Sequence, residues 1–450
     1  MKLGGETSFL LESVEGGERW GRYSFIALDP FLVMTARGSS ITWQGEAPSV
    51  QSSSPLEAFR EAIESFTTPD MPGLPPFFAG AVGYMGYDMV RHLEDIPNAA
   101  RRELDTPDML MMFPRTVVCF DHLRQRMTIV TLASQDFSSD KAEAVNEKVA
   151  SVLAEPAAFP SLELQEQKPR AAGSTMTKDQ FEAAVGTAKN YILAGDIFQV
   201  VLSHRLSQPL AVDPFQVYRV LRLVNPSPYM FFLRHPEITV TGSSPEPLIR
   251  VQDRKVVQRP IAGTRPRGDS EGEDDTIEEE LRSDPKERAE HVMLVDLARN
   301  DIGRVSEYGS VVVEELMTVE RYSHVMHLVS QVSGLLRSDC SPLDALYASF
   351  PAGTVSGAPK IRAMEIIDEL EAVRRGPYAG IVGYFDTSGN LDTCIALRTA
   401  YIVDGRIHVQ AGAGIVADSD PASEWQETLD KAKALLTAIA IADGGSRELQ

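Results

Sequence analysis

The chain has 450 residues, of which 43% are hydrophobic and 24% are charged, a composition typical of a globular protein with a sizeable core. Its formal net charge of −21 argues against nucleic-acid binding, which requires a basic surface that displaces counterions. No apolar run approaches the roughly 20 residues that span a bilayer, no secretory signal is recognisable and only three cysteines occur, so we expect a cytoplasmic protein with no membrane partner.

The first part of the chain, up to about residue 130, is rich in turns and in alternating segments that favour antiparallel strands. A polar, helix-prone segment follows at residues 138–155. Residues 156–174 are rich in Pro, Gln and Ala, which indicates a surface linker. We therefore predict an N-terminal α+β domain at 1–155, a linker at 156–174 and a second domain at 175–440.

The second part opens with a predicted helix, because residues 177–180 resemble a helix cap and apolar residues recur after them at helical spacing. A strand is expected at 197–202. Helices and strands then mix without the steady alternation of a doubly wound sheet, which favours the α+β class. The acidic run 271–280 is typical of a solvated loop that leads into a helix.

Two further helix starts carry carboxylates on one face. Asp284 can cap a helix that presents Glu287 and Glu290 three residues apart, and Glu287 can complete a capping box. A second start at residue 420 precedes Glu424 and Glu427, with a lysine four residues further on. Two such helices can hold Mg²⁺, a cation that prefers oxygen ligands. From spacing alone, an exposed ion-paired helix face explains the same pattern.

A glycine pair at residues 412 and 414 lies between apolar, strand-like segments. Glycine lets backbone N–H groups approach a ligand closely, so the pair can hold a carboxylate. The alternative is a bulge or bend within a strand.

The segment Arg259–Gly268, RPIAGTRPRG, resembles the active-site loop of the chorismate-utilising enzymes. Nearly the whole chain resembles the anthranilate synthase component I group of that family, and this resemblance implies large, mostly antiparallel sheets in a sandwich-like core flanked by helices. The motifs that carry the resemblance lie at residues 10–13, 21–26, 198–203, 225–232, 242–246, 289–301, 377–380 and 396–399.

The resemblance implies Mg²⁺ as the cofactor and chorismate as the substrate. Glu290 and Glu427 would bind the metal, which would hold the ring carboxylate of chorismate. Lys431 would add positive charge near the metal-bound end of the substrate.

The resemblance also assigns residues to the rest of the substrate. Arg398, Tyr378 and the backbone amides of Gly412, Ala413 and Gly414 would hold the enolpyruvyl carboxylate. Gly263 and Thr264 would line the ring, with Thr354 and His327 beside it.

The reaction that the resemblance implies has two steps: ammonia adds at C2 while the C4 hydroxyl leaves, and pyruvate is then eliminated to give an aromatic ring. Glu246 would be the acid for the departing hydroxyl, which requires a raised pKa. His327 would assist pyruvate loss. Ala262 excludes a covalent lysine, and Gln199 replaces the lysine that activates water in relatives that make isochorismate, so both residues point to ammonia as the nucleophile.

Members of the family receive ammonia from a glutaminase. Because no Gly-x-Cys-x-Gly segment occurs here, we expect the glutamine amidotransferase to be a separate partner chain. Four residues match the family's pocket for tryptophan, the expected feedback inhibitor: Ser13, Pro228, Tyr229 and Met230.

Two alternative functions share these motifs. The first is aminodeoxychorismate synthase component I, some members of which also lack the lysine. The second is a catalytically silent subunit that only binds an effector, although the presence of Glu246, Glu290, Arg398 and Glu427 argues against it.

Overall fold

The computed structural model describes residues 5–14, 21–68, 71, 73–156, 171–322 and 325–444. Its strands, in chain order, are β1 (Ser8–Glu12), β2 (Tyr23–Arg37), β3 (Ser40–Gly45), β4 (Gly80–Met85), β5 (Met109–Asp121), β6 (Arg126–Thr131), β7 (Gly173–Ser174), β8 (Gln199–Pro209), β9 (Tyr229–His235), β10 (Ile238–Ser244), β11 (Pro247–Gln252), β12 (Lys255–Gln258), β13 (Ile261–Pro266), β14 (Val312–Arg321), β15 (Val325–Leu335), β16 (Gly357–Ala358), β17 (Ile381–Asp386), β18 (Leu391–Ile395), β19 (Thr399–Val403) and β20 (Arg406–Ile415).

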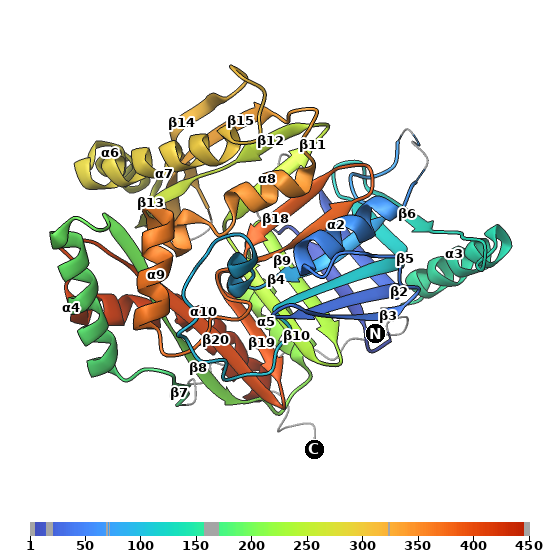
Figure 1. Ribbon diagram of the computed structural model, residues 1–450, viewed down its shortest axis with the longest axis horizontal. Helices are drawn as coiled ribbons and strands as arrows, with labels where there is room; N and C mark the ends of the chain where they lie inside the picture. The colour runs from blue at the N-terminus through green and yellow to red at the C-terminus, as the bar shows by residue number, and fades with distance from the viewer. Residues whose placement is uncertain are drawn as a thin grey trace.

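The helices cover this strand framework on several sides (Figure 1). They are α2 (Pro55–Ser65), α3 (Ser139–Ala154), α4 (Lys178–Ala194), α5 (Pro214–Val224), α6 (Glu271–Ser283), α7 (Pro285–Gly303), α8 (Pro342–Ser349), α9 (Lys360–Leu370) and α10 (Pro421–Gly444), with short 3₁₀ turns η1 (Tyr87–His92) and η2 (Gly353–Val355). Among the described residues, none of these helices is both long and apolar enough to cross a membrane.

All pairings between the named strands are antiparallel, and they follow one continuous path through the described chain. The path runs β8–β20–β19–β10–β9–β1–β2–β5–β4–β17–β18–β11–β12–β15. At one end β13 and β14 pair with β15, and at the other β7 and β16 pair with β8. The predicted α+β class with mostly antiparallel sheets is therefore confirmed.

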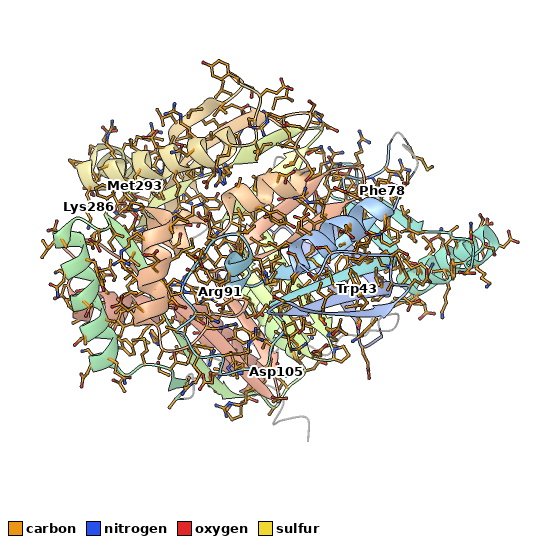
Figure 2. The ribbon with its side chains drawn as sticks, in the orientation of Figure 1. Trp43, Phe78, Arg91, Asp105, Lys286 and Met293 are labelled. Atoms are coloured by element: carbon orange, nitrogen blue, oxygen red, sulfur yellow. The ribbon has the colours of Figure 1, made fainter. Side chains whose placement is uncertain are left out.

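The core has three main layers of buried side chains. An inner layer of aromatic and aliphatic residues from β1, β2, β4, β9, β10 and β17 lies between the two halves of the sheet path, as in a sandwich. On one outer face α5 and α10 pack against β19, β20 and β9. On the other, α2 and α8 pack with β4, β11 and β17 in the largest cluster. Figure 2 draws the side chains on the ribbon in the same orientation.

The N-terminal and C-terminal parts of the chain share this sheet. Strand β1 pairs with β9, and β4 pairs with β17, so residues far apart in sequence are hydrogen-bonded. In Figure 1 the blue N-terminal elements occupy the right side and α4, α6, α7 and α9 the left. The division into domains at 1–155 and 175–440 stays a prediction, and residues 157–170 of the proposed linker lie outside the described residues.

Several local predictions are confirmed. Helix α3 covers the predicted segment 138–155, and Thr177 caps α4 in a complete capping box with Gln180. Strand β8 begins at Gln199, two residues later than predicted, and extends to Pro209 because β20 pairs along its full length.

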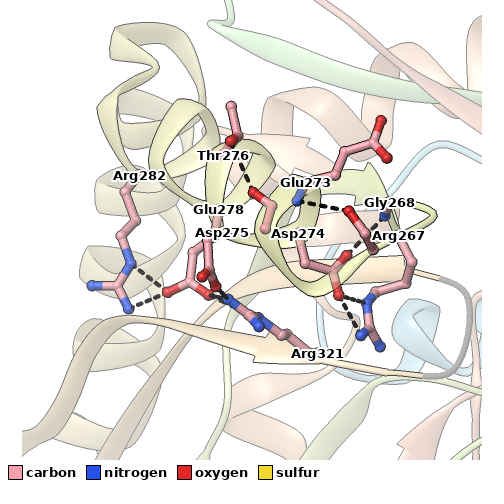
Figure 3. A network of polar contacts seen from close by, with 11 residues as sticks. Arg267, Gly268, Glu273, Asp274, Asp275, Thr276, Glu278, Arg282 and Arg321 are labelled. Atoms are coloured by element: carbon pink, nitrogen blue, oxygen red, sulfur yellow. Dashed lines mark hydrogen bonds and ion pairs between the residues drawn. The ribbon is translucent and has the colours of Figure 1, made fainter.

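The prediction of a loop at 271–280 is wrong, because these residues form α6. Ser270 caps this helix by accepting a hydrogen bond from the Glu273 N–H, and acidic residues suit the first turn of a helix. Arginines offset the remaining repulsion (Figure 3). Arg267 pairs with the buried Asp274, and Arg321 pairs with Asp275 and Glu278.

Candidate active site

Glu246 lies in the short connection between β10 and β11. Its carbonyl oxygen accepts the Ile395 N–H at 3.0 Å, which fixes the backbone, and its carboxyl accepts the Thr354 hydroxyl at 3.0 Å. Both side chains line a cavity of about 50 Å³. Burial raises the pKa of Glu246 to about 7, although the Thr354 hydrogen bond and the charge of Lys431 lower it. A protonated carboxyl is therefore available near neutral pH.

Helix α7 carries Glu287 and Glu290, as predicted, and Asp284 caps it by accepting the Lys286 and Glu287 N–H groups. The predicted capping box is wrong. The Asp284 N–H already bonds the Glu280 carbonyl at the end of α6, and the Glu287 carboxylate instead pairs with Arg265 at 2.9 Å.

Helix α10 presents the second set of carboxylates. Ser423 donates its N–H to Asp420, which caps the predicted helix start. Glu427 pairs with Lys431 at 2.7 Å, and the Lys431 ammonium also donates to the Gly412 carbonyl at 3.1 Å. Lys431 therefore links α10 to β20 at the level of the glycine pair.

The carboxylates of the two helices share one electrostatic environment. Burial raises the pKa of Glu290, with repulsion from Glu287 as the next cause, and burial likewise raises the pKa of Glu424. The charges of Lys286 and Lys431 act on both Glu290 and Glu424. Lys286, labelled in Figure 2, stands at the start of α7. One lysine of each helix thus acts on a carboxylate of both helices, and the shared metal site of α7 and α10 stays a prediction.

This donor set is compatible with Mg²⁺. Repulsion between neighbouring carboxylates and their raised pKa values mark a place where a divalent cation would lower the free energy. Among the described residues, no group of three His, Cys, Asp or Glu side chains is arranged to hold a metal ion by itself. Mg²⁺ commonly takes one or two protein carboxylates together with substrate oxygens and water.

His327 lies on β15, paired with Thr264 on β13. Its Nδ1 contacts the Thr264 hydroxyl at 3.0 Å and the Gly263 carbonyl at 3.2 Å. Because a carbonyl only accepts, the bond to Gly263 places the proton on Nδ1 and leaves Nε2 as the basic nitrogen. Burial lowers the pKa of His327, and the nearby charge of Arg398 lowers it further, so the ring is neutral.

Gly263 is needed at the bulge that aims this strand. Its φ of 63° lies in the left-handed region, and the β13–β15 register shifts between Ala262 and Thr264. A Cβ at Gly263 would lie 3.1 Å from the Glu287 carboxylate, so glycine also permits the close approach of α7.

The glycine pair at residues 412 and 414 lies in an unbroken strand. Residues 406–415 of β20 pair with β8 without a register shift, so of the alternatives for residues 412–414 a bulge is wrong. A Cβ at Gly412 would lie 2.9 Å from the Tyr378 hydroxyl, and one at Gly414 would lie 2.7 Å from the Gln199 amide nitrogen. The glycines thus let Tyr378 and Gln199 approach the strand, while the Ala413 side chain is fully buried.

The sequence-predicted residues form three groups in direct contact: Glu246 with Thr354, His327 with Gly263 and Thr264, and Lys431 with Glu427 and Gly412. Gln199 on β8 contacts α7, since its amide nitrogen lies 3.5 Å from a Glu290 oxygen. Their individual roles stay predictions.

Comparisons with known proteins agree with this arrangement. The sequence profile of chorismate binding enzymes matches residues 7–437. The chain belongs to the family of chorismate binding enzymes. It is 48% identical to anthranilate synthase component 1 of Acetivibrio thermocellus, over 96% of this chain and 90% of that protein, and 48% identical to that of Pseudomonas putida, over 97% and 90%. The crystal structure of anthranilate synthase component I from Streptococcus pneumoniae matches with a TM-score of 0.84 and 38% identity, over 94% of this chain and 95% of that one.

This chorismate binding enzyme has a second, larger cavity of about 240 Å³. All four residues predicted for the effector, Ser13, Pro228, Tyr229 and Met230, contribute to its wall. The cavity lies against β1, β9, β11 and β18, and is therefore formed by both the N-terminal and the C-terminal parts of the chain.

Charged residues that the sequence did not single out also line this cavity. Arg250 donates to Asp392 at 2.8 Å, and Asp392 also accepts the Tyr229 hydroxyl at 2.9 Å. Glu12 binds the Arg222 guanidinium and the Tyr218 hydroxyl, and Arg22 also lines the wall. Glu12 and Arg22 lie within the motifs at residues 10–13 and 21–26, whereas Arg250 and Asp392 lie on strands at positions that no motif marked.

Proposed function

We propose that this chain is the chorismate-converting component of an anthranilate synthase, a lyase that forms anthranilate and pyruvate from chorismate and ammonia. The observation that carries the proposal is the pairing of a carboxyl that is protonated near neutral pH, Glu246, with acidic helices that suit a divalent cation. The 48% identity to proteins of that name supports the same choice.

A direct assay tests this proposal. The purified chain is mixed with chorismate, Mg²⁺ and ammonium at alkaline pH, and anthranilate is followed by its fluorescence while pyruvate is measured separately. We expect both products in equal amounts. Formation of an amino-deoxychorismate without pyruvate would instead support the aminodeoxychorismate synthase alternative, and absence of turnover would support a silent subunit.

For the cofactor, Glu290 and Glu427 would hold Mg²⁺, with Glu287 and Glu424 close by. When bound, the ion would neutralise the ring carboxylate of chorismate and withdraw electron density from the reacting system. Lys431, which already pairs with Glu427, would contribute positive charge to the same end of the substrate.

The other end of the substrate would be held by Arg398, Tyr378 and the backbone of residues 412–414. A guanidinium forms strong charge-assisted hydrogen bonds with a carboxylate, and the buried Tyr378 hydroxyl lies beside Gly412. Gly263 and Thr264 would then border the ring on the side of β13.

The proposed chemistry assigns one proton task to each of two groups. Glu246 would donate its proton to the C4 hydroxyl, which leaves as water while ammonia bonds to C2 and the ammonium so formed releases one proton. His327 has a lowered pKa and a basic Nε2, so it would accept the C2 proton as the bond between the ring and the enolpyruvyl oxygen breaks. The ring becomes aromatic, and the released enolpyruvate takes up a proton to give pyruvate. Thr354 would hold the Glu246 carboxyl in place through its hydrogen bond.

Ammonia would come from a separate glutamine amidotransferase subunit. The name component 1 that the relatives carry indicates a second component. The chain alone should therefore use ammonium but not glutamine. Glutamine-dependent anthranilate formation by the purified chain would contradict this assignment.

Tryptophan is the proposed feedback inhibitor, and the cavity of about 240 Å³ is its proposed site. Its wall combines aromatic and apolar groups with both positive and negative side chains, which suits an amino acid that carries both charges. A cytoplasmic location completes the proposal, in agreement with three cysteines that are all free thiols.

A further inference from the structure

Arg375 is the largest fully buried side chain among the described residues, with 1% of its side chain exposed. It lies just beyond α9, and its guanidinium forms a two-point ion pair with Glu371. Nε donates to one carboxylate oxygen at 2.9 Å and Nη2 to the other at 2.6 Å. Burial of a charged pair is unfavourable unless further hydrogen bonds satisfy both groups.

Those further bonds reach two separate backbone segments. Arg375 donates from Nη1 to the Val355 carbonyl and from Nη2 to the Val201 carbonyl, each at 2.7 Å. Glu371 accepts the Ser203 N–H at 2.8 Å and the Ser203 hydroxyl at 2.9 Å. One ion pair therefore joins η2 to β8.

Each contacted segment leads directly to a group of the proposed active site. Val355 follows Thr354, whose hydroxyl bonds Glu246. Ser203 pairs with Gly412 across β8 and β20. The guanidinium carbon also lies 5.7 Å from the centre of the Tyr378 ring, within cation–π range.

We infer that Arg375 and Glu371 act as a positioning pair, which holds the Thr354 turn, the β8–β20 glycine strand and Tyr378 in the arrangement that the reaction requires. The inference rests on the proposed function. The guanidinium is planar and has five N–H donors in a fixed fork, so it can bond one carboxylate and two carbonyls at once; a lysine ammonium has three donors around a single point.

A double substitution separates positioning from folding. Arg375→Met with Glu371→Leu removes both charges together, so no unpaired charge stays buried. We expect a melting temperature within a few degrees of the unsubstituted chain, and a kcat/KM for chorismate reduced at least tenfold, with both a lower kcat and a higher KM. A folded double variant with unchanged kcat and KM would overturn the inference.

The pH dependence gives a readout that a purely structural role would not move. Groups that act on the Glu246 carboxyl are Thr354 and Lys431, while Arg259 and Asp301 line the same small cavity. The Thr354 bond lowers the pKa of Glu246, so displacement of the turn raises that pKa and keeps the acid protonated at higher pH. The activity of the double variant relative to the unsubstituted chain should therefore rise with pH above 7, as it should for Thr354→Val. If the ratio of the two activities does not change with pH, the positioning role is contradicted. Protonation of ammonia affects both enzymes equally, so it does not alter this ratio.

A matched control is the pair formed by Arg205 and Glu103, in which a buried arginine on the same strand as Ser203 contacts Glu103 and Tyr401 instead of η2. Arg205→Met with Glu103→Gln should leave the pH profile unshifted. If the Arg375 double variant does not fold, Glu371→Asp retains both charges but withdraws the carboxylate from both Arg375 and Ser203. It should show the same upward shift, and native behaviour would overturn the inference. Failure of the unsubstituted chain to convert chorismate would instead count against the proposed function.

Discussion

The proposed metal site and the cavity beside β1 differ in how their charged side chains are balanced. At the proposed metal site, Glu287 and Glu427 are paired with Arg265 and Lys431, but Glu290 and Glu424 have raised pKa values because they are partly buried next to further carboxylates. In the cavity, Arg250 is paired with Asp392, and Glu12 with Arg222.

The difference matches the ligands proposed for the two sites. Binding of a cation lowers the free energy of a site that has a surplus of negative charge. The bound cation would in turn attract a dianion such as chorismate. A balanced wall favours a small molecule that carries one charge of each sign. The overall charge of −21 therefore says little about either site, because binding depends on local charge.

The two sites are also connected through one pair of strands. Arg250 and Asp392 lie on β11 and β18, which are paired, and both line the larger cavity. Glu246 directly precedes β11, and its carbonyl accepts the N–H of Ile395, the last residue of β18. An effector in the larger cavity would thus contact the same two strands that hold the backbone of Glu246 in place.

The largest effect should come from Glu246→Gln, which keeps the shape of the side chain and its acceptor for Thr354 but removes the acid proton. We expect kcat to fall by roughly 10²–10⁴-fold, the usual contribution of a positioned acid. Steady-state anthranilate formation measures this loss, and a thermal melt checks folding. Turnover within about threefold of the unsubstituted chain would remove Glu246 from the mechanism.

Substitution of the acidic helices should change the response to metal. Glu290→Gln and Glu427→Gln should each raise the Mg²⁺ concentration for half-maximal activity by about 10–100-fold, the range seen when groups around a metal are altered. Binding of Mn²⁺, followed by electron paramagnetic resonance without substrate, should weaken in parallel. Glu279→Gln, on an exposed position of the neighbouring α6, is the control that should bind Mn²⁺ normally.

In the larger cavity, Arg22→Met should weaken tryptophan inhibition. The guanidinium lines the cavity and is about one-third exposed, so its attraction for a carboxylate is moderate. We expect the half-inhibiting tryptophan concentration to rise about tenfold, which corresponds to roughly 1.4 kcal/mol. A titration at fixed chorismate measures the change, and an unaltered inhibition curve would show that tryptophan does not contact Arg22.

The smallest expected effect is a shift in pH dependence for Thr354→Val. Glu246 must be protonated to act as an acid, so activity on this limb falls as pH rises through its pKa of about 7. Loss of the Thr354 hydrogen bond raises that pKa further, and the limb should move to higher pH by less than about one unit. Thr187→Val on α4, where the hydroxyl bonds only the Ala183 carbonyl among its described partners, should leave the limb in place.

Local sequence signals predicted the starts of the helices well. Thr177, Asp284 and Asp420 all accept backbone N–H groups at the positions expected of caps, because capping depends on residues within one turn. The same local reasoning gave a wrong prediction at 271–280, where a run of like charges indicated a loop but the residues form a helix. The arginines that stabilise it, Arg267 and Arg321, lie outside the run.

The resemblance to a known family named some residues of both cavities: Ser13 and Tyr229 line one, and Glu246 and Thr354 line the other. It did not reveal the pairs that support them. Arg375 with Glu371, and Arg250 with Asp392, lie at positions where the surrounding residues give no sign that a charge is buried.

The sequence by itself determined the class of fold and the helix starts, since these follow from short-range patterns, and its resemblance to a known family named the candidate reactive groups. Tertiary structure decided the raised pKa of Glu246, the contact between Gln199 and Glu290, and the balance of charge around each site. These properties depend on burial and on partners up to hundreds of residues away, and burial is set only when the strands and helices pack.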